Sequence, residues 1–255
     1  MIIKQPSTKL SQHQIMHAIG GSEVNFKQSA GEIVYEKSLI QVLKALDIKP
    51  KQLHHGNQVH GANVEIVNAN AGEQPLFAGY PLSPETDGFI TAEAEVALLV
   101  RMADCTPIVI YDPVNKVIAA VHSGWRSTVQ NISHQAIYKM VRQFGSEVAH
   151  LIAYVGPSID QANYEVGPEV YEAFEEVGNR ERYFKAQGEK YLLDMVQANI
   201  EVLKLAGMTI DNIEFSTEST YTSERLHSAR KEGKEYQLNA LVVMMSKSQD
   251  SLEKS

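Results

Sequence analysis

The chain has 255 residues, of which 44% are hydrophobic and 21% are charged, so it can bury a sizeable core. Its formal net charge of −8 disfavours binding to nucleic acid or to anionic lipid, since such binders concentrate Lys and Arg on one face. We therefore expect a folded protein that acts on a small molecule.

The N-terminal residues MIIKQPSTKLSQHQ lack the apolar stretch of an export signal, and no run of about 18 apolar residues occurs in the chain. We expect a cytoplasmic protein that does not span a membrane. Its single cysteine, Cys105, cannot form an internal disulfide, which fits a reducing compartment. It also excludes a structural zinc site of several cysteines, so any metal site must depend on histidine.

Hydrophobic periodicity predicts the first elements. Residues 31–48 show helical spacing, and the predicted apolar face consists of Ile33, Leu39, Ile40, Leu43 and Leu46. Residues 62–69 are expected to form a short strand. The nearly continuous apolar run 96–102 predicts a strand that is buried on both faces.

A β-hairpin is predicted next, from strands 107–111 and 116–122 joined by the turn sequence DPVN. A helix over residues 129–144 should follow, with Ser127 or Thr128 as its cap.

The remaining chain is predicted to alternate helices and strands. These are strand 151–156, helix 167–177, helix 190–208, and strands 209–215 and 236–245. The polar tail 246–255 is expected to fray. Because no repeat or low-complexity linker divides the sequence, residues 1–255 are predicted to form a single α+β domain.

The hairpin brings the only cysteine near a histidine. In the expected register Thr106 lies opposite His122, and Cys105 lies one step further along. A regular strand would point Cys105 to the wrong face, but a bulge at Pro107, which cannot join the ladder freely, would re-aim the sulfur. Thiol and imidazole are therefore expected to be near neighbours.

A second histidine, His60 in the segment QVHG, makes a possible metal-binding set with Cys105 and His122. Two histidines and one cysteine leave one tetrahedral position open, which is the arrangement of a catalytic zinc rather than a structural one. Such a zinc would keep the thiol deprotonated and acidify a water in the open position.

Two other interpretations of Cys105 stay open. A free cysteine in a strand-rich segment is commonly a small buried hydrophobic residue, and a cysteine beside a histidine can be a nucleophile that needs no metal. Spacing alone does not separate these roles. Other histidines are interpreted as surface or hydrogen-bonded core residues: His54, His55, His134, His150 and His227.

Five segments together resemble the bacterial YfiH family, once described as a multicopper polyphenol oxidase or laccase and related to the vertebrate laccase-domain protein FAMIN. They are QVHG (58–61), ADCTP (103–107), VHSGWR (121–126), GPSI (156–159) and YEVGPEV (164–170). The resemblance implies a layered αββα sandwich with mixed sheets, shared with cysteine-hydrolase-like toxins. It also implies that His60, Cys105 and His122 hold zinc.

The resemblance further implies an enzyme of purine nucleosides. The expected reactions are phosphorolysis of adenosine, inosine and methylthioadenosine, giving free base and a ribose 1-phosphate, and deamination of adenosine in the same pocket. A laccase would need several copper centres with many histidines, whereas this chain has 9 histidines and no His-x-His. Zinc is the expected metal, with copper as a competitor in vitro.

Other motif residues are assigned roles from their chemistry. Arg126 is expected just before a helix, where its guanidinium and the free N–H groups of the first turn would bind phosphate, unless it only pairs with a surface carboxylate. Asp87 is a candidate catalytic acid or base, or a residue that orients a ligand histidine, and Asp104 has the same alternatives or caps a turn. Trp125 would stack on a purine or anchor the core.

The C-terminal segment departs from the family pattern. Ser219 stands where the family has a cysteine, and HSARK stands at its arginine motif, where Arg230 is the one matching arginine and is assigned to substrate binding. Lys37 stands where an arginine is common. Two alternatives are therefore kept: a zinc-stabilised nucleoside-binding or scaffold protein with little turnover, and an amide hydrolase of cell-wall precursors that uses Cys105 as nucleophile.

Overall fold

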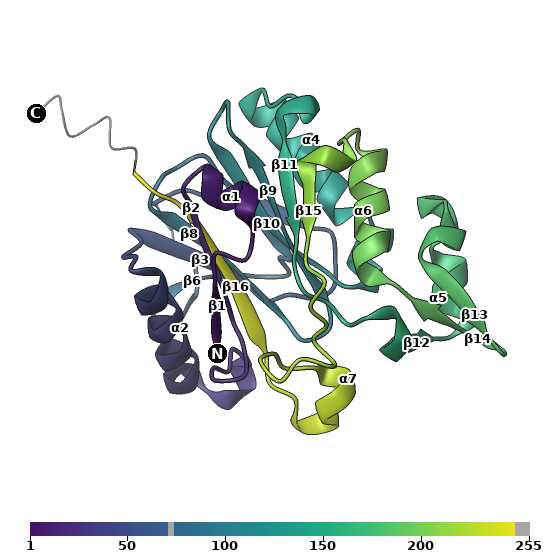
Figure 1. Cartoon of the computed structure of the whole chain (residues 1–255). Coiled ribbons are helices and arrows are strands. Elements are labelled where there is room, and N and C mark those ends of the chain that lie inside the picture. Colours follow the sequence, from purple (N-terminus) through teal and green to yellow (C-terminus); the bar gives the residue numbers. More distant parts are fainter. Residues whose placement is uncertain (71–73, 248–255) are drawn as a thin grey trace, which may run out of the picture.

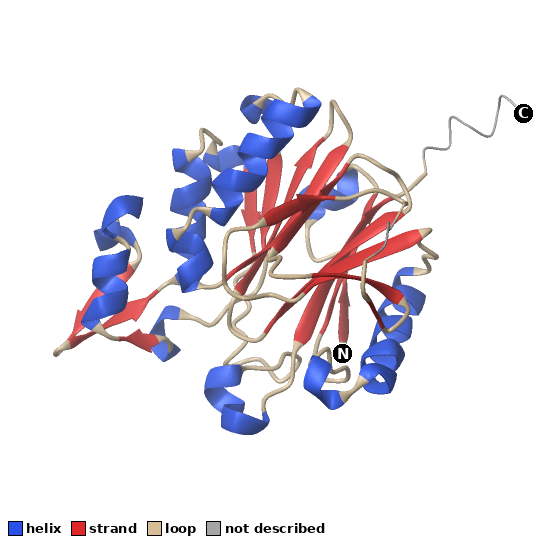
Figure 2. Cartoon of the chain, turned by 180° about the vertical axis from the view of Figure 1, so that it is seen from behind, coloured by secondary structure: helices blue, strands red, loops and turns tan. Residues whose placement is uncertain are grey.

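The structure is a computed structural model that describes residues 1–70 and 74–247. Two mixed β-sheets pack face to face, and helices cover their outer faces (Figures 1 and 2). The predicted α+β class and αββα layering are therefore confirmed. The predicted frayed tail 246–255 lies outside the described residues from 248 onward, and the single domain over 1–255 stays a prediction.

The first sheet contains strands from the N-terminal, the middle and the C-terminal parts of the chain. It has seven strands in the order β1-β2-β16-β8-β3-β6-β5, with β16 antiparallel to β2 and β8, and β3 parallel to β8 and β6. In that order the strands are Ile2–Lys4, Ile15–Gly20, Asn239–Met245, Val96–Met102, Gln52–Gly56, Tyr80–Ser83 and Leu76–Phe77.

The second sheet has six strands in the order β15-β11-β9-β10-β7-β4. These strands are Ile213–Phe215, Ile152–Val155, Thr106–Asp112, Val117–Ser123, Gly88–Thr91 and Val64–Ile66. A small third sheet lies at one end of the molecule beside α5 (Figure 1). Its strands are β12 (Glu165–Val166), β14 (Lys190–Leu193) and β13 (Phe184–Gln187).

Helix α2 covers the first sheet, and α4 and α6 cover the second (Figure 1). The α-helices are α1 (Thr8–Gln12), α2 (Glu32–Leu46), α3 (Trp125–Val129), α4 (Ile132–Phe144), α5 (Pro168–Ala173), α6 (Met195–Leu205) and α7 (Ala229–Glu232). The predicted apolar face of α2 is partly wrong, because Ile33 and Ile40 are exposed. The predicted Leu39 and Leu46 are buried, and Tyr35 and Val42 complete the buried stripe at the same helical spacing.

Every residue of β8, β9 and β10 is buried, so the predicted double burial of residues 96–102 is confirmed. Leu98 and Val100 pack between the sheets, whereas Ala97 and Leu99 face α2. Each fully buried Val, Leu or Ile side chain contributes about 1.5–3 kcal/mol, so this central layer rigidly supports the loops at its edge.

The hairpin β9–β10 has a register one residue away from the prediction. His122 pairs with Pro107 and Ser123 with Thr106, because Asp112 belongs to the last strand pair and its side chain accepts N–H groups of the turn. Residues opposite each other share a face, as do residues two apart in a strand. Cys105 is thus on the His122 side without a bulge, and the expected bulge at Pro107 is not needed.

Two predicted helices are divided. Residues 125–144 form α3 and α4, which are separated at Asn131 with a φ of +57°, so Ser127 and Thr128 lie inside α3 and do not cap α4. The predicted helix 190–208 begins as strand β14, and α6 starts only where Asp194 accepts a hydrogen bond from the N–H of Gln197.

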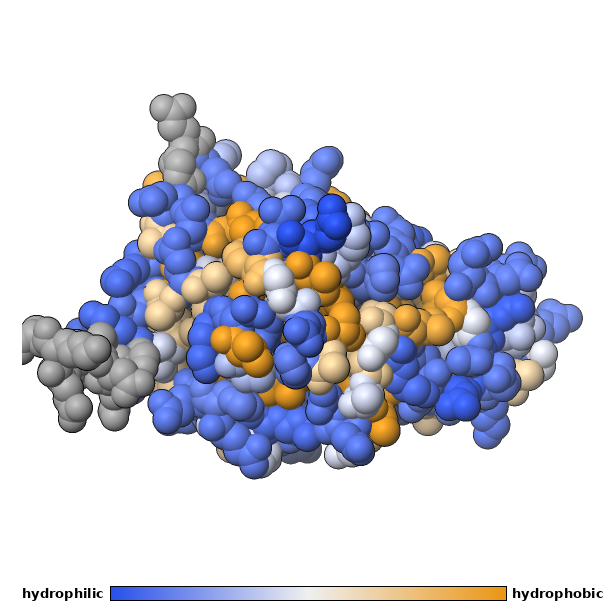
Figure 3. Space-filling view, turned by 90° about the horizontal axis from the view of Figure 1, so that it is seen from above, coloured by the Kyte–Doolittle hydropathy of each residue, from blue (hydrophilic) through white to orange (hydrophobic). Residues whose placement is uncertain are grey.

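One face of the molecule shows hydrophobic residues at the surface in patches that hydrophilic residues separate (Figure 3). Exposed apolar side chains such as Val114, Tyr138 and Leu205 come from different elements, as is ordinary for folded proteins. Within the described residues, no helix has both the length and the apolar character needed to cross a bilayer.

Candidate metal centre

Three side chains from separate segments meet at one edge of the sheets. His60 lies in the loop between β3 and β4, Cys105 directly precedes β9, and His122 lies near the end of β10. One donor atom from each lies within 4.8 Å of the other two, and the two imidazole centroids are 4.9 Å apart. The structure thus brings together the three predicted ligands, which we call the donor cluster. His122 is buried, Cys105 half-buried and His60 exposed.

The loop that carries His60 is wrapped around the carboxylate of Asp87, which is fully buried. The backbone N–H groups of three successive residues, Val59, His60 and Gly61, donate to the Asp87 oxygens at 3.1, 3.0 and 2.9 Å. Successive N–H groups that converge in this way form an anion-binding nest. The nest accounts for the left-handed backbone of His60, whose φ is +60°.

Asp87 also orients the second histidine. Its Oδ1 lies 2.9 Å from Nδ1 of His122, so the other ring nitrogen, Nε2, is left for the donor cluster. Burial alone would raise the pKa of Asp87, but the hydrogen bond and charge of His122 and the N–H groups of the nest outweigh it and lower that pKa. One carboxylate therefore positions both histidines.

The thiol of Cys105 is poised to lose its proton. Burial opposes the thiolate, yet the neighbouring His122 and His60 outweigh burial and lower the pKa of Cys105. The negative charge on the sulfur and on Asp87 in turn raises the pKa of His122 against the effect of burial. A thiolate beside two imidazoles is a donor set for zinc or copper, and also an activated nucleophile.

Gly124 leaves the room that the donor cluster needs. A Cβ placed on this residue would lie 2.9 Å from Sγ of Cys105 and 2.9 Å from Cδ2 of His60, closer than real Cβ contacts allow. Its φ of −75° does not itself require glycine, so the constraint comes from the neighbouring donors. The donor types, their spacing and this clearance together fit a metal ion.

The two arginines assigned to the site lie at its outer side. Arg126 is exposed and lies inside α3, because the helix begins at Trp125, so its expected position just before a helix is wrong. Its guanidinium lies 4.2 Å from the Trp125 ring centroid, and Trp125 packs against the apolar cluster of α5 and α6. The Arg230 guanidinium donates to the carbonyl of Glu165.

A tyrosine in the motif YEVGPEV connects these arginines to the donor cluster. Burial raises the pKa of Tyr164, and the charges of Cys105, Arg230 and Arg126 all act on this hydroxyl. The Arg230 guanidinium lies 5.2 Å from the Tyr164 ring centroid. Sequence reasoning gave Tyr164 no role, although the residue opens a motif quoted for the family.

Asp104 contacts neither histidine in the described hydrogen bonds. Its carboxylate accepts from the Thr220 hydroxyl and from the backbone N–H of Arg230 at 2.7 Å each, and its carbonyl accepts from Ser158. Its φ is +83°. The residue beside Cys105 thus ties β9 to two C-terminal segments.

A cavity of about 340 Å³ opens beside the donor cluster. Besides the cluster, its lining includes Lys27, Gln58, Arg101, Ala229, Tyr236 and Leu238. Sequence reasoning missed Arg101, whose signal is a single charge inside the otherwise apolar run VALLVRM. Arg126 and Arg230 do not belong to this lining.

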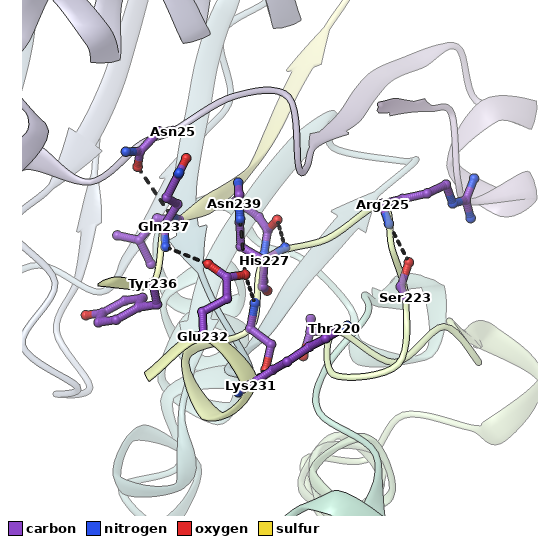
Figure 4. A network of polar contacts seen from close by, with 12 residues as sticks. Asn25, Thr220, Ser223, Arg225, His227, Lys231, Glu232, Tyr236, Gln237 and Asn239 are labelled. Carbon is purple, nitrogen blue, oxygen red and sulfur yellow. Dashed lines mark hydrogen bonds and ion pairs between the residues drawn. The ribbon is translucent and has the colours of Figure 1, made fainter. Parts of the chain in front are cut away.

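The divergent C-terminal segment forms one wall of this cavity, and a polar network holds it in place (Figure 4). Glu232 accepts hydrogen bonds from the N–H groups of Ser228 and Gln237. Asn239 accepts from the N–H of His227 and donates to its carbonyl. Both ends of segment 227–239 are thereby fixed, so the changed sequence still builds a defined wall.

The histidines interpreted as core or surface residues lie outside the donor cluster. His134 and His150 are exposed, and His54, His55 and His227 are buried. His55 and His227 use both ring nitrogens in hydrogen bonds. His54 uses Nε2, and its Nδ1 has no partner within the described residues.

Comparisons with known proteins agree with the family resemblance that the five sequence segments indicate. The chain is 32% identical to the Bacteroides thetaiotaomicron "Purine nucleoside phosphorylase" over 72% of this chain and 67% of that protein. It is 31% identical to "Adenosine deaminase RL5" from an unknown prokaryotic organism, over 68% and 65% of the two chains. The crystal structure of Bacillus licheniformis hypothetical protein YfiH matches with a TM-score of 0.84 and 22% identity, over 91% of this chain and 93% of that one.

A family model covers most of the described chain, including all three residues of the donor cluster and the cavity wall. It matches residues 27–246 and is described as "Multi-copper polyphenol oxidoreductase laccase". The expected resemblance is thus confirmed: the chain belongs to this laccase-like, YfiH-type family.

Proposed function

We propose that the chain is a zinc-dependent enzyme of purine nucleosides. The reaction is phosphorolysis of adenosine, inosine or methylthioadenosine, and the same pocket deaminates adenosine. The observation that carries the proposal is the donor cluster of His60, Cys105 and His122 in the lining of a cavity. The curated relatives, named for phosphorolysis and for deamination, support the substrate class.

Zinc is the metal we assign to the donor cluster. Two imidazoles and one thiolate are the protein ligands of catalytic zinc sites that keep a fourth position open. When bound, zinc supplies a Lewis acid at the cavity wall. Copper would compete for the same donors in vitro, but a single three-ligand cluster among the described residues does not support multicopper oxidation.

Asp87 acts as a positioning residue in this proposal. Its oxygens are already engaged by three backbone N–H groups and by His122, and the side chain is fully buried. These contacts favour orientation of the ligand histidines over direct acid or base catalysis. Cys105 serves as ligand, and its lowered pKa supports the thiolate form that a metal requires.

Phosphorolysis joins a phosphate oxygen to C1′ of the ribose while the bond from C1′ to the purine nitrogen breaks. The electron pair leaves on the base, which takes up a proton, so the products are free base and ribose 1-phosphate. We propose that Arg126 and Arg230 contact the substrate on the Tyr164 side of the donor cluster. The position of Arg230, whose guanidinium lies 5.2 Å from the Tyr164 ring centroid, supports this placement.

A nucleoside panel tests the proposed function. Zinc-loaded protein is incubated with adenosine, inosine and methylthioadenosine, with and without phosphate, and the products are separated by chromatography. We expect free base only with phosphate, and inosine from adenosine without it. Nucleoside binding without any product would instead establish the binding or scaffold alternative.

The thiolate beside His122 favours one second candidate, an amide hydrolase that uses Cys105 as nucleophile. Such an enzyme would act on cell-wall precursors and would keep its activity after chelation of the metal. Alkylation of Cys105 would abolish that activity. Zinc-loaded protein that resists alkylation, and becomes reactive only after chelation, would exclude this candidate.

A further inference from the structure

Arg101 places a guanidinium at the end of a buried apolar face. On β8, Ala97 and Leu99 pack toward α2, and Arg101 continues the same alternation where the strand reaches the cavity. The residue is only 6% exposed. A buried charge is costly unless it is paired, so its partners decide whether it has a structural role or binds a ligand.

The hydrogen bonds of Arg101 are incomplete. Nη2 donates to the carbonyl of Gly56 at 2.8 Å, whereas Nε is buried and has no acceptor in the described part of the chain. No carboxylate forms an ion pair with Arg101 within residues 1–70 and 74–247. Asp87 is near enough to act on its charge, but that carboxylate is occupied by His122 and the nest. The guanidinium therefore lacks a counter-charge.

The backbone of Arg101 is fixed by hydrogen bonds, although those of its side chain are incomplete. Gln58 accepts the N–H of Arg101 at 2.8 Å and donates to its carbonyl at 2.8 Å. Gln58 belongs to the loop that leads to His60, so one loop sets the position of both the arginine and a cluster histidine. This arrangement preorganises the guanidinium beside the donor cluster.

The charged residues that line the cavity also favour an anionic ligand. Its described lining contains two cations, Arg101 and Lys27, and no aspartate or glutamate, although the whole chain carries a net charge of −8. Lys27 is fixed at the wall, where Nζ donates to the Tyr236 carbonyl and lies 3.9 Å from that ring centroid. An anionic ligand would supply the charge that both residues lack.

We propose that Arg101, assisted by Lys27, forms the subsite for inorganic phosphate in the cavity beside the donor cluster. This rests on the proposed function, and it locates the co-substrate at a different place from Arg126. A guanidinium matches two phosphate oxygens at once, and a lysine adds a point charge. The phosphate would supply the counter-charge that Arg101 lacks and would lie in the same cavity as the cluster.

Calorimetric titration of zinc-loaded protein with inorganic phosphate tests the subsite directly. We expect Arg101→Gln to weaken phosphate binding about 10-fold to 100-fold, because it removes a charge-assisted hydrogen bond. Arg101→Lys should retain part of the affinity. Lys27→Met, which leaves β8 untouched, should also weaken binding and keeps the test valid if Arg101→Gln does not fold. Arg142→Gln, an exposed arginine of α4, is the matched control.

Kinetics provide the second measurement. Arg101→Gln should raise the KM for phosphate and leave the KM for inosine nearly unchanged, which a merely structural role would not do. Loss of phosphate binding in Arg126→Ala, with Arg101→Gln and Lys27→Met unaffected, would overturn the proposal. Binding of adenosine 5′-monophosphate but not of inorganic phosphate would overturn the assignment to the co-substrate.

The two proposals fail in different ways. Phosphate binding that depends on Arg101, in a protein that releases no purine base, would support the subsite and remove the proposed function. Phosphate-dependent base release with an unchanged KM for phosphate in Arg101→Gln and Lys27→Met would do the reverse.

Discussion

Oδ1 of Asp87 lies 2.9 Å from Nδ1 of His122 and 3.0 Å from the backbone N of His60, so one buried oxygen aligns both histidines of the donor cluster. We expect Asp87→Asn to weaken zinc binding about 10-fold to 100-fold. An amide fixes the orientation of the His122 ring less well than a carboxylate does, and it raises the basicity of that ligand less. Competition with a chromogenic chelator measures the affinity. Asp211→Asn, at an exposed position, is the control, and equal affinity in both variants would refute this role of Asp87.

Gly124→Ala should damage the metal centre more than the fold. The added Cβ would lie 2.9 Å from Sγ of Cys105 and from Cδ2 of His60, so the donors must move apart. We expect zinc affinity to fall about 10-fold or more, while unfolding of the metal-free protein changes by about 1–3 kcal/mol. Gly61→Ala is the matched control, because its Cβ would meet no atom of the described residues closer than 3.5 Å. Similar zinc affinities in the two variants would argue against a metal at this place.

Cys105→Ser and His122→Ala should each remove most of the bound zinc. Both residues contribute donors to the same three-ligand set, and the remaining pair cannot complete a catalytic zinc site. Metal analysis of purified protein gives the stoichiometry, with one zinc per chain expected in the wild type. Full zinc content in both variants would place the metal elsewhere.

The stability of the fold should fall in mild acid because of His55. Its Nδ1 lies 2.8 Å from the Tyr35 hydroxyl, and burial, together with the charge of Arg101, lowers its pKa from 6.5 to about 4. Between these values the unfolded chain binds a proton that the folded chain does not. The contribution of neutral His55 to the free energy of unfolding is fully present above pH 6.5 and is lost as the pH falls toward 4. By pH 5 the loss is about 2 kcal/mol.

Urea unfolding at pH 7 and pH 5 measures this effect. His55→Asn keeps a polar group near Tyr35 but cannot titrate, so its stability should decrease less between the two pH values than that of the wild type. His17 and His54, whose pKa values are also lowered by burial, contribute in the same direction in both proteins. An equal decrease in the two proteins would contradict the assignment to His55.

The sequence predicted the elements with strong local patterns. The apolar run 96–102 was sufficient to predict β8. The turn chemistry between β9 and β10 was sufficient to place Cys105 near His122, and the QVHG segment supplied His60. The register was wrong by one residue because it depends on which residue closes the turn, and Asp112 does so through its side chain. Local patterns do not encode that choice.

The rest depends on contacts between distant segments. Strand β16 inserts between β2 and β8, and no periodicity reveals such a pairing. The role of Arg101 could not be predicted from the apolar run around it. Its position at the cavity depends on contacts with Gln58 and Gly56, which are distant in sequence. Asp87 was predicted with two roles, and the four hydrogen bonds of its carboxylate favour positioning.

We propose that the donor cluster binds the zinc on which nucleoside phosphorolysis depends. The most direct test is to titrate zinc into metal-free protein and to measure phosphate-dependent release of hypoxanthine from inosine at each addition. We predict that activity rises in proportion to zinc and reaches a plateau at one equivalent per chain. Full activity in the metal-free protein, or no activity at one equivalent of bound zinc, would show that phosphorolysis does not depend on zinc in the donor cluster.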